Sequence, residues 1–448
     1  MLNEAATERK RDASVRAGYT LALLTLLNAF LVLDKVVLTT LVEPIRHAFG
    51  LSDLELGALM GSAYAVSLGV AAVPLGALAD RSNRRNLAAL CVAVWSVMTG
   101  LFGTAQNLTQ LLLARIGVGI GEAGGAPAAI AMIADMYPGR RRSTAMAVFS
   151  TGTQLGALIN LMFMTQITHA YGWRATLLTC SILGMLLAIA LRATIGEPQR
   201  GIDRVGSTAG APPALGVTLR FITTQRSLVH LLIGATLSYL VIGGMGAWHF
   251  TFLMRTHHLK LNKIGPVLGL GIAVLGAIAS LLSGYLGDRL GVRDERYRVW
   301  IIAAGSIFTF AIGVGSLVVV SWRCSVVLVA AFAAMVTFWF PITAALAQTL
   351  VEERMRATTA GVIVLLSSLV GYGVGPPAVG GLSDALSRIY GVDGLRYALL
   401  ATSMLILWAA MHFLRAARTL RADLAKVAAI AQRGRNEAAA PRTPGRSV

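Results

Sequence analysis

The sequence predicts an all-α membrane protein with twelve transmembrane helices in two six-helix halves, and three observations lead to this fold class. Of its 448 residues, 56% are hydrophobic and only 13% are charged, whereas a soluble domain usually carries about 25% charged residues. Apolar stretches of about 20 residues, the length that crosses a bilayer as a helix, recur from end to end. One long polar segment divides these stretches into two equal sets.

The stretches are expected to be helices, because lipid offers no hydrogen bonds to the backbone and a helix pairs its own polar groups. The short alternating segments of a transmembrane β-barrel are not evident. In chain order we expect spans at 17–45, 52–79, 86–105, 109–136, 143–168, 172–195, 227–254, 264–287, 299–320, 325–350, 358–383 and 394–415. The first is too long for the apolar region of a signal peptide, so we expect it to stay in the mature protein.

The segment 196–226 is rich in glycine and proline and is the one long polar stretch between spans. It is expected to be a cytoplasmic linker between an N-terminal half, 17–195, and a C-terminal half, 227–415. A cytoplasmic N-terminus, 1–16, and a basic cytoplasmic tail, 416–448, flank the two halves.

The loop charges predict the orientation of the protein in the membrane. If both termini are cytoplasmic, the inner segments hold 29 Lys and Arg residues and the outer loops hold 8. Cytoplasmic loops carry the excess of these residues, so the count favours this orientation in a plasma membrane, the inner membrane in a Gram-negative bacterium. The net charge of +18 comes from these short loop clusters and not from a basic domain, so we expect no nucleic-acid partner.

An internal repeat relates the two predicted halves. The segment 76–81 follows the second span, and the similar segment 284–289 follows the eighth span, 208 positions later. Arg142 before the fifth span has a counterpart in Arg356 before the eleventh. Two repeats in the same orientation imply an axis along the membrane normal and a substrate site between them near the midplane.

The segment 76–85 contains the most specific motif. Gly76 lets a neighbouring helix come close, and Asp80 is placed to face the positive N-terminus of another helix. Arg81, Arg84 and Arg85 can pair with acidic groups or anionic lipid. The segment resembles the G-x-L-a-D-r-x-g-R-R signature of the major facilitator superfamily, although Asn83 stands where that family usually has glycine.

This resemblance implies a major facilitator fold whose halves are latched at the cytoplasmic side by this loop, with Asp288 and Arg289 in the repeat. The other interpretation is a positive-inside loop with no gating role.

Four ionisable residues lie inside predicted spans, Asp34 and Lys35 in the first and Arg115 and Glu122 in the fourth. Such residues are costly in a membrane and by default mark a functional site. Arg115 and Glu122 are two turns apart, so they share a helix face at a separation of about 10.5 Å. We expect the four charges to face one space and to exchange partners, with Asp34 or Glu122 carrying protons. A static ion cluster that fixes helix packing is the alternative.

The stretch Gly121-Glu122-Ala123 resembles the G-E-A signature of the Spinster family of lipid transporters. Further similar segments, from the first span to the eleventh, are 33–35, 43–45, 244–255, 287–294, 348–357 and 375–384. The resemblance implies proton-linked transport of lysolipids or sphingoid lipids by alternating access. It makes Asp34 and Glu122 proton and headgroup sites and Arg115 their partner. Lys35 stands where the family usually has arginine, and lysine lacks the fork that grips phosphate.

Other side chains are weaker candidates. Those that could form an apolar cavity wall are Tyr239, Trp248, His249, Phe338, Trp339 and Gln348. Gly152 and Gly156 form a small-residue packing stripe in the fifth span. The three cysteines show neither disulfide nor metal-ligand spacing, so we expect no metal.

We therefore expect a secondary active transporter with a rocker-switch cycle around spans 1, 4, 7 and 10. No phosphate-binding G-x-x-x-x-G-K-[ST] motif occurs, so we expect an ion gradient to drive it, with no cofactor. Efflux or uptake of small organic anions or drugs is the first alternative, and a sensor or scaffold with a vestigial transporter fold is the second. No nucleophile–base pair or metal-ligand set suggests an enzyme. The expected partners are an amphiphilic or organic-anion substrate, protons and membrane lipids, and the family implies a monomer.

Overall fold

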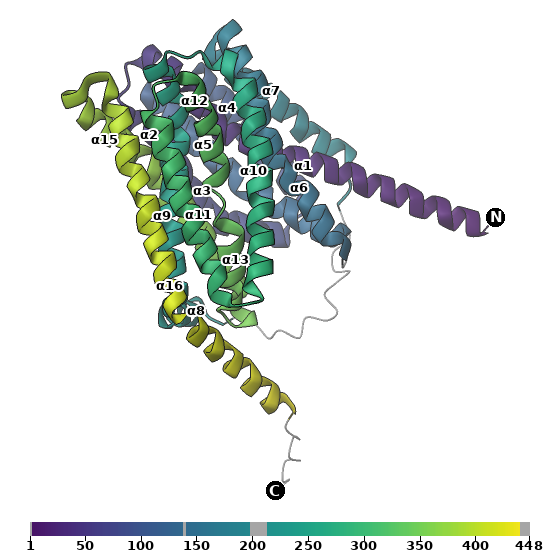
Figure 1. Ribbon diagram of the computed structural model, residues 1–448. Coiled ribbons are helices and arrows are strands. Elements are labelled where there is room, and N and C mark those ends of the chain that lie inside the picture. The colour runs from purple at the N-terminus through teal and green to yellow at the C-terminus, as the bar shows by residue number, and fades with distance from the viewer. Residues whose placement is uncertain (1, 138–139, 198–212, 440–448) are drawn as a thin grey trace.

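The computed structural model describes residues 2–137, 140–197 and 213–439, and within them every regular element is a helix (Figure 1). The helices before the linker are α1 (Leu2–Phe49), α2 (Asp53–Met60), α3 (Ser62–Arg81), α4 (Arg84–Thr104), α5 (Leu108–Met136), α6 (Arg140–Ile159), η1 (Asn160–Met164) and α7 (Thr165–Thr194).

The elements after the linker form the second half. They are α8 (Leu215–Thr224), α9 (Arg226–His257), α10 (Leu261–Gly291), α11 (Glu295–Val318), α12 (Trp322–Met335), α13 (Phe340–Thr349), η2 (Glu353–Met355), α14 (Arg356–Leu366), η3 (Ser367–Tyr372), α15 (Gly373–Tyr390), η4 (Gly391–Asp393) and α16 (Gly394–Ala439).

Ten stretches of these helices are long and apolar enough to cross a membrane. Two of them contain a reversal of the chain. The stretch Thr144–Thr194 turns at Gly172, whose φ is 83°, and Glu353–Ile430 turns at Gly391, whose φ is 58°. Positive φ is a conformation that glycine adopts readily and other residues avoid. Division at these two turns gives the twelve expected spans.

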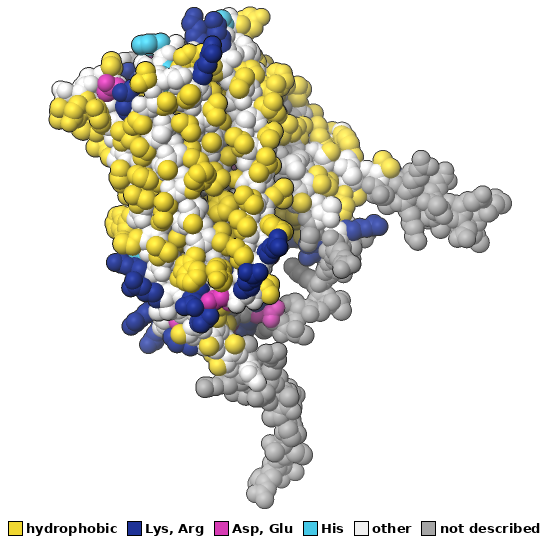
Figure 2. All heavy atoms as spheres, viewed as in Figure 1, with side chains coloured by type: hydrophobic (Ala, Val, Ile, Leu, Met, Phe, Trp, Pro, Cys, Tyr) yellow, Lys and Arg dark blue, Asp and Glu magenta, His cyan; other side chains and the backbone are white. Residues whose placement is uncertain are grey.

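The side-chain distribution agrees with a membrane environment. Figure 2 shows a broad apolar band around the middle of the bundle, with Lys and Arg gathered beyond its two edges. Large apolar side chains such as Val73, Leu281 and Ile189 are more than half exposed on this band. Because water would penalise so large an apolar surface, lipid is its natural solvent. The protein is a multi-pass membrane protein.

Several predicted spans are not single α-helices. Span 52–79 is broken at Gly61, and span 325–350 changes direction between α12 and α13. Spans 143–168 and 358–383 each contain a π-helical segment, η1 and η3. These two segments lie at nearly the same offset that relates 76–81 to 284–289, so the irregularity itself follows the repeat.

Glycines allow helices to approach closely within and between the halves. A Cβ on Gly152 or Gly156 would lie 3.0 Å from backbone atoms of α1, which confirms the predicted packing stripe. A Cβ on Gly57 in α2 would meet the Pro377 Cα in α15 at 2.6 Å. A Cβ on Gly243 in α9 would meet the carbonyl carbon of Gly371 in η3 at 2.7 Å.

We call the end of the bundle that carries α8 the inner end, and the opposite end the outer end (Figure 1). α1 reaches the outer end at Phe49, and α2 begins there with Ser52 as its cap. The Ser52 hydroxyl accepts the Glu55 N–H, and the Glu55 carboxylate accepts the Ser52 N–H at 2.8 Å. This reciprocal cap satisfies backbone donors at the start of α2 and fixes where the chain turns back into the bundle.

Candidate functional site

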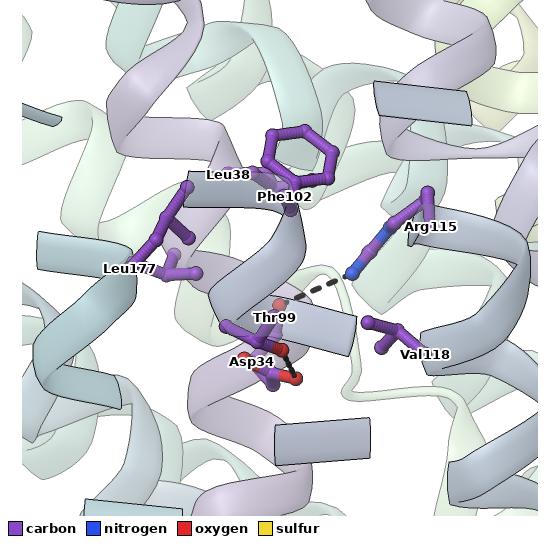
Figure 3. Close-up of a pocket in the computed structure, with 8 residues that line it drawn as sticks. Asp34, Leu38, Thr99, Phe102, Arg115, Val118 and Leu177 are labelled. Carbon is purple, nitrogen blue, oxygen red and sulfur yellow. Dashed lines mark hydrogen bonds between the residues drawn. The ribbon is translucent and has the colours of Figure 1, made fainter. Parts of the chain in front are cut away.

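Asp34 lies on α1 in the interior of the N-terminal half, where only 6% of its surface is exposed. The Thr99 hydroxyl of α4 donates a hydrogen bond of 2.6 Å to its carboxylate (Figure 3). A void of about 10 Å³ lies against Asp34, Thr99 and Arg115. A space of about 10–15 Å³ accommodates one water molecule, so the carboxyl group has room beside it for a single water.

Arg115 projects from α5 toward the same place and binds main-chain oxygens (Figure 3). Its Nη1 donates to the Asp34 carbonyl oxygen at 3.4 Å, and its Nε donates to the Leu59 carbonyl oxygen at 3.3 Å. The guanidinium carbon also lies 4.5 Å from the centre of the Tyr64 ring. Arg115 is therefore held by α1, α2 and α3 together.

Glu122 lies two turns further along α5, and the hydroxyl of Tyr64 donates a hydrogen bond to its carboxylate. Tyr64 thus touches Arg115 with its ring and Glu122 with its hydroxyl, which confirms that these two residues share a helix face. The sequence interpretation missed Tyr64, because a tyrosine in an apolar span carries no signal that separates it from ordinary packing residues.

The predicted mutual neutralisation of the four charges is wrong for this conformation. Within the part of the chain that the structure describes, no ion pair joins any two of Asp34, Lys35, Arg115 and Glu122. Backbone carbonyls and Tyr64 are closer to the Arg115 guanidinium and take its hydrogen bonds and ring contact. One atom on each side remains without a hydrogen-bond partner, Arg115 Nη2 and Glu122 Oε1.

Lys35 points away from these groups into a cavity of about 380 Å³ between the two halves. The cavity walls come from α1, α6, α9 and α12, with Tyr372 and Pro376 from the eleventh span, so the expected contribution of the fourth span is replaced by α6 of the fifth. The lining residues are Val32, Lys35, Val36, Thr39, Met60, Thr153, Ala157, Ile242, Gly243, Gly246, Ala247, His249, Phe250, Val329, Phe332, Ala333, Val336, Thr337, Tyr372 and Pro376.

Of the six predicted wall residues, His249 lines this cavity and the other five do not. The Tyr239 ring packs edge-on against Trp339 at 5.0 Å, inside the C-terminal half. The Trp248 indole donates to the Pro376 carbonyl at 2.9 Å. These rings make contacts between helices, which is the usual role of buried aromatic residues.

Phe338 and Gln348 also lie away from the cavity wall. Phe338 is buried and its ring fills the space above Gly305. The main-chain oxygen of Gln348 accepts the Arg356 guanidinium at 3.2 Å.

The inner loop that carries the family signature is bound within its own half. Arg84 forms an ion pair with Asp135 of α5, and the Arg84 and Arg85 backbone amides donate to Glu197 at 3.0 and 2.9 Å. A Cβ on Gly76 would meet no atom within 4 Å, so the expected close approach of a neighbouring helix is wrong here.

The remaining residues of the two inner loops make few contacts. The side chain of Asp80 lies outside the described residues. Arg81, Asp288 and Arg289 are exposed, and Arg289 binds the hydroxyl of its neighbour Tyr285 at 2.5 Å. A latch between the halves made by these loops stays a prediction.

An ion cluster that the sequence interpretation missed joins the halves at the outer end. Arg255 at the end of α9 donates to both Asp53 carboxylate oxygens at 2.6 and 2.7 Å and to Glu43 at 2.6 Å. The Ser383 hydroxyl of α15 also donates to Asp53, at 2.7 Å. The Asp384 carboxylate accepts the first amides of α2 at 3.0 and 2.8 Å. The outer end is therefore closed by charge-assisted hydrogen bonds.

The Major Facilitator Superfamily model matches residues 24–376. The chain belongs to the major facilitator superfamily. This facilitator is 30% identical, over 92% of its length and 95% of the relative's, to a protein described as an MFS-type efflux pump of Mycolicibacterium smegmatis. It is 25% identical to the sphingosine-1-phosphate transporter SPNS2 of Mus musculus, over 90% of this chain and 78% of that one. Its class is a secondary transporter, not an enzyme.

Among solved structures, the facilitator resembles a bacterial homologue of the human lysosomal transporter Spinster in an inward-facing and unoccupied conformation. The TM-score is 0.81 at 27% identity, and the match covers 91% of this chain and 98% of the other. The occupied form of that homologue gives a TM-score of 0.78 at 26% identity, with the same coverage. The facilitator is thus Spinster-like in sequence and in structure, as its motifs predicted.

Proposed function

We propose that this facilitator moves an amphipathic organic anion across the membrane by alternating access, driven by protons. The observation that carries the proposal is the position of Lys35. Its ammonium group lies in a cavity between the halves whose wall is otherwise mostly apolar, and no carboxylate is paired with it among the residues described. An apolar wall with one unpaired cation suits a molecule that has an apolar body and one anionic group.

The proton-carrying part of the proposal rests on Asp34 and Glu122. Both are buried carboxyl groups with few partners: Asp34 has the Thr99 hydroxyl, and Glu122 has the Tyr64 hydroxyl. A carboxylate only accepts hydrogen bonds, whereas a carboxylic acid also donates one. Gain or loss of a proton therefore changes which hydrogen bonds this cluster can form, and α1 carries the change to Lys35 next in sequence.

The closed outer end supports the alternating-access part. Arg255, Asp53 and Glu43 join α9 to α1 and α2, while Arg84 at the inner end pairs within its own half. We propose that the cavity opens toward the cytoplasm in this conformation, that both termini are cytoplasmic, and that the protein works as a monomer in the plasma membrane.

A lysolipid or sphingoid lipid is the first substrate class to test, because named relatives include a sphingosine-1-phosphate transporter. A smaller organic anion or drug is the second, because the named relative at 30% identity is an efflux pump and the cavity holds only about 380 Å³.

The test is transport of a labelled lysophospholipid into proteoliposomes, with and without an imposed pH gradient. Wild type is compared with Glu122→Gln and with Glu295→Gln, a matched control at the inner end of α11. We expect wild type and the control to respond to the gradient and Glu122→Gln to lose that response. If wild type ignores the lysolipid but transports a labelled aromatic carboxylate, the second class replaces the first. If neither moves, the proposal fails.

A further inference from the structure

The contact between Lys35 and Tyr372 has a role beyond packing. We infer that the Tyr372 ring holds the Lys35 ammonium when the cavity is empty, and that an anionic substrate must displace this ring to bind. Tyr372 then sets the affinity for the substrate, and its displacement releases a contact between the two halves. The inference rests on the proposed function, because it requires a substrate with an anionic group.

The geometry places the ring directly on the cation. Lys35 Nζ lies 3.6 Å from the centre of the Tyr372 ring and 5.8 Å from the centre of the Tyr64 ring. A cation attracts an aromatic face within about 6 Å of its centre. No hydrogen bond or ion pair of the Lys35 ammonium is found in the described parts of the chain. The ring of the C-terminal half is thus the principal partner of this cation.

Two π-helical segments hold the turn of α1 that carries Lys35. Tyr372 is the last residue of η3, in the C-terminal half. Asn160 is the first residue of η1, in the N-terminal half. The Asn160 amide donates to the Val36 carbonyl at 3.3 Å, and its oxygen accepts the Thr40 hydroxyl at 3.3 Å. π-helical turns occur often at functional sites, and here both converge on one turn of α1.

The two contacts differ in what can replace them. Asn160 binds the main chain of α1, which a substrate in the cavity cannot substitute. Tyr372 binds the ammonium with its ring face, and a carboxylate or phosphate offers that ammonium charge-assisted hydrogen bonds instead. Lysine is a compact, strongly hydrated point charge with three donors, so it gains more from an anion than from a ring. The Tyr372 contact is therefore the one that gives way.

The expected size of the effect follows from the strength of a cation–π contact. Such contacts are worth about 0.5–2 kcal/mol, which corresponds to about a two- to thirtyfold change in an equilibrium constant. Competition from Tyr372 should weaken the binding of an anion by this factor. The same displacement removes a link between the halves, so an anion binds the state without the link more tightly and shifts the population toward it.

The first measurement needs no ligand. In nanodiscs, the rate of reductive methylation at Lys35 is followed by mass spectrometry in wild type, Tyr372→Leu and Tyr372→Phe. We expect Tyr372→Leu to react about two to thirty times faster, and Tyr372→Phe to match wild type because it keeps the ring. Tyr372→Met serves as a second ring-free variant should Tyr372→Leu not fold. An unchanged rate in the ring-free variants would overturn the inference.

The second measurement is the binding of laurate, with uncharged monolaurin as the control. We expect the Kd for laurate to fall in Tyr372→Leu by the same factor as the methylation rate rises, with no change for monolaurin. Asn160→Ala should affect both probes alike. Equal gains for laurate and monolaurin would show mere widening of the cavity and would refute the competition. Faster methylation with no laurate binding by any form would instead refute the proposed anionic substrate.

Discussion

Replacement of Arg255 by methionine should open the outer end of the protein. Arg255 is the one residue of α9 that binds both Asp53 and Glu43, and its side chain is only 14% exposed. Methionine keeps a similar length and flexibility but removes all three hydrogen bonds of 2.6–2.7 Å. The Asp53 carboxylate, which is 2% exposed, then keeps Ser383 at 2.7 Å and Arg46 at 3.8 Å.

The magnitude follows from the burial of Asp53. Removal of one partner from a buried ion pair costs about 3–5 kcal/mol, because the other charge stays buried and uncompensated. Since Ser383 and Arg46 remain, we take the lower end, about 3 kcal/mol. In an outward-open state the carboxylate would be hydrated, so this cost falls on the closed state alone. The ratio of open to closed molecules should rise about a hundredfold.

The assay measures access to the cavity from outside. Thr39 lines the cavity on α1, so a Thr39→Cys reporter is labelled in intact cells with a membrane-impermeant thiol reagent. The exposed Cys324 is first replaced by serine, while Cys91 and Cys180 are buried and stay. We expect slow labelling when Arg255 is present and much faster labelling with Arg255→Met.

Arg46→Met is the matched control. Arg46 is 40% exposed and its Nε lies 3.8 Å from Asp53, and exposed pairs of this kind contribute about 0–1 kcal/mol. It should change the labelling rate little. Equal labelling with and without the Arg255→Met substitution, with normal expression of both proteins, would refute the claim that this cluster holds the outer end closed.

The contacts already described support three further predictions. Asp384→Asn removes the negative charge at the start of α2, worth about 0.3–1 kcal/mol, and should raise the same labelling rate only about two- to fivefold. Gly243→Leu should lower the thermal denaturation temperature in detergent, measured by tryptophan fluorescence, because its Cβ would lie 2.7 Å from Gly371. Gly246→Leu, whose Cβ would meet no atom within 4 Å, should be tolerated. The backbone N–H of Arg296, then its guanidinium and that of Arg421, hold the pKa of Asp294 below its usual 3.8. This stabilisation is present above the unfolded pKa and is lost as pH falls through the lower folded pKa, so pepsin should cut α16 near Arg421 more readily only below about pH 4. Asp294→Asn should abolish that dependence on pH.

Hydropathy alone predicted the twelve spans, because an apolar length of about 20 residues is a local property of the chain. It could not predict where a span is broken. The π-helical segments η1 and η3 contain ordinary apolar residues, and the extra residue in such a turn is accommodated by packing against neighbouring helices. The reversals at Gly172 and Gly391 were correctly placed between spans, since polar residues flank both glycines.

The candidate site was predictable only as far as charge makes a residue conspicuous. Asp34 and Glu122 stand out in apolar spans, and the structure buries both in the core. Tyr64 and Tyr372 carry no such signal, because their importance comes from which cation lies against each ring. Arg255 and Asp53 are 202 residues apart, and only the packing of the two halves brings them together.

The matching π-helical segments also say something about how this chain arose. A π turn is an α-helix that holds one residue more than its regular geometry needs. Two such turns at corresponding places, Asn160–Met164 and Ser367–Tyr372, require two separate insertions if the halves acquired them independently. One insertion in an ancestral six-helix gene, copied when that gene was duplicated and fused, explains both. By this reasoning the extra residue is older than the two-half protein, and each copy has since been given a different neighbour on the same turn of α1.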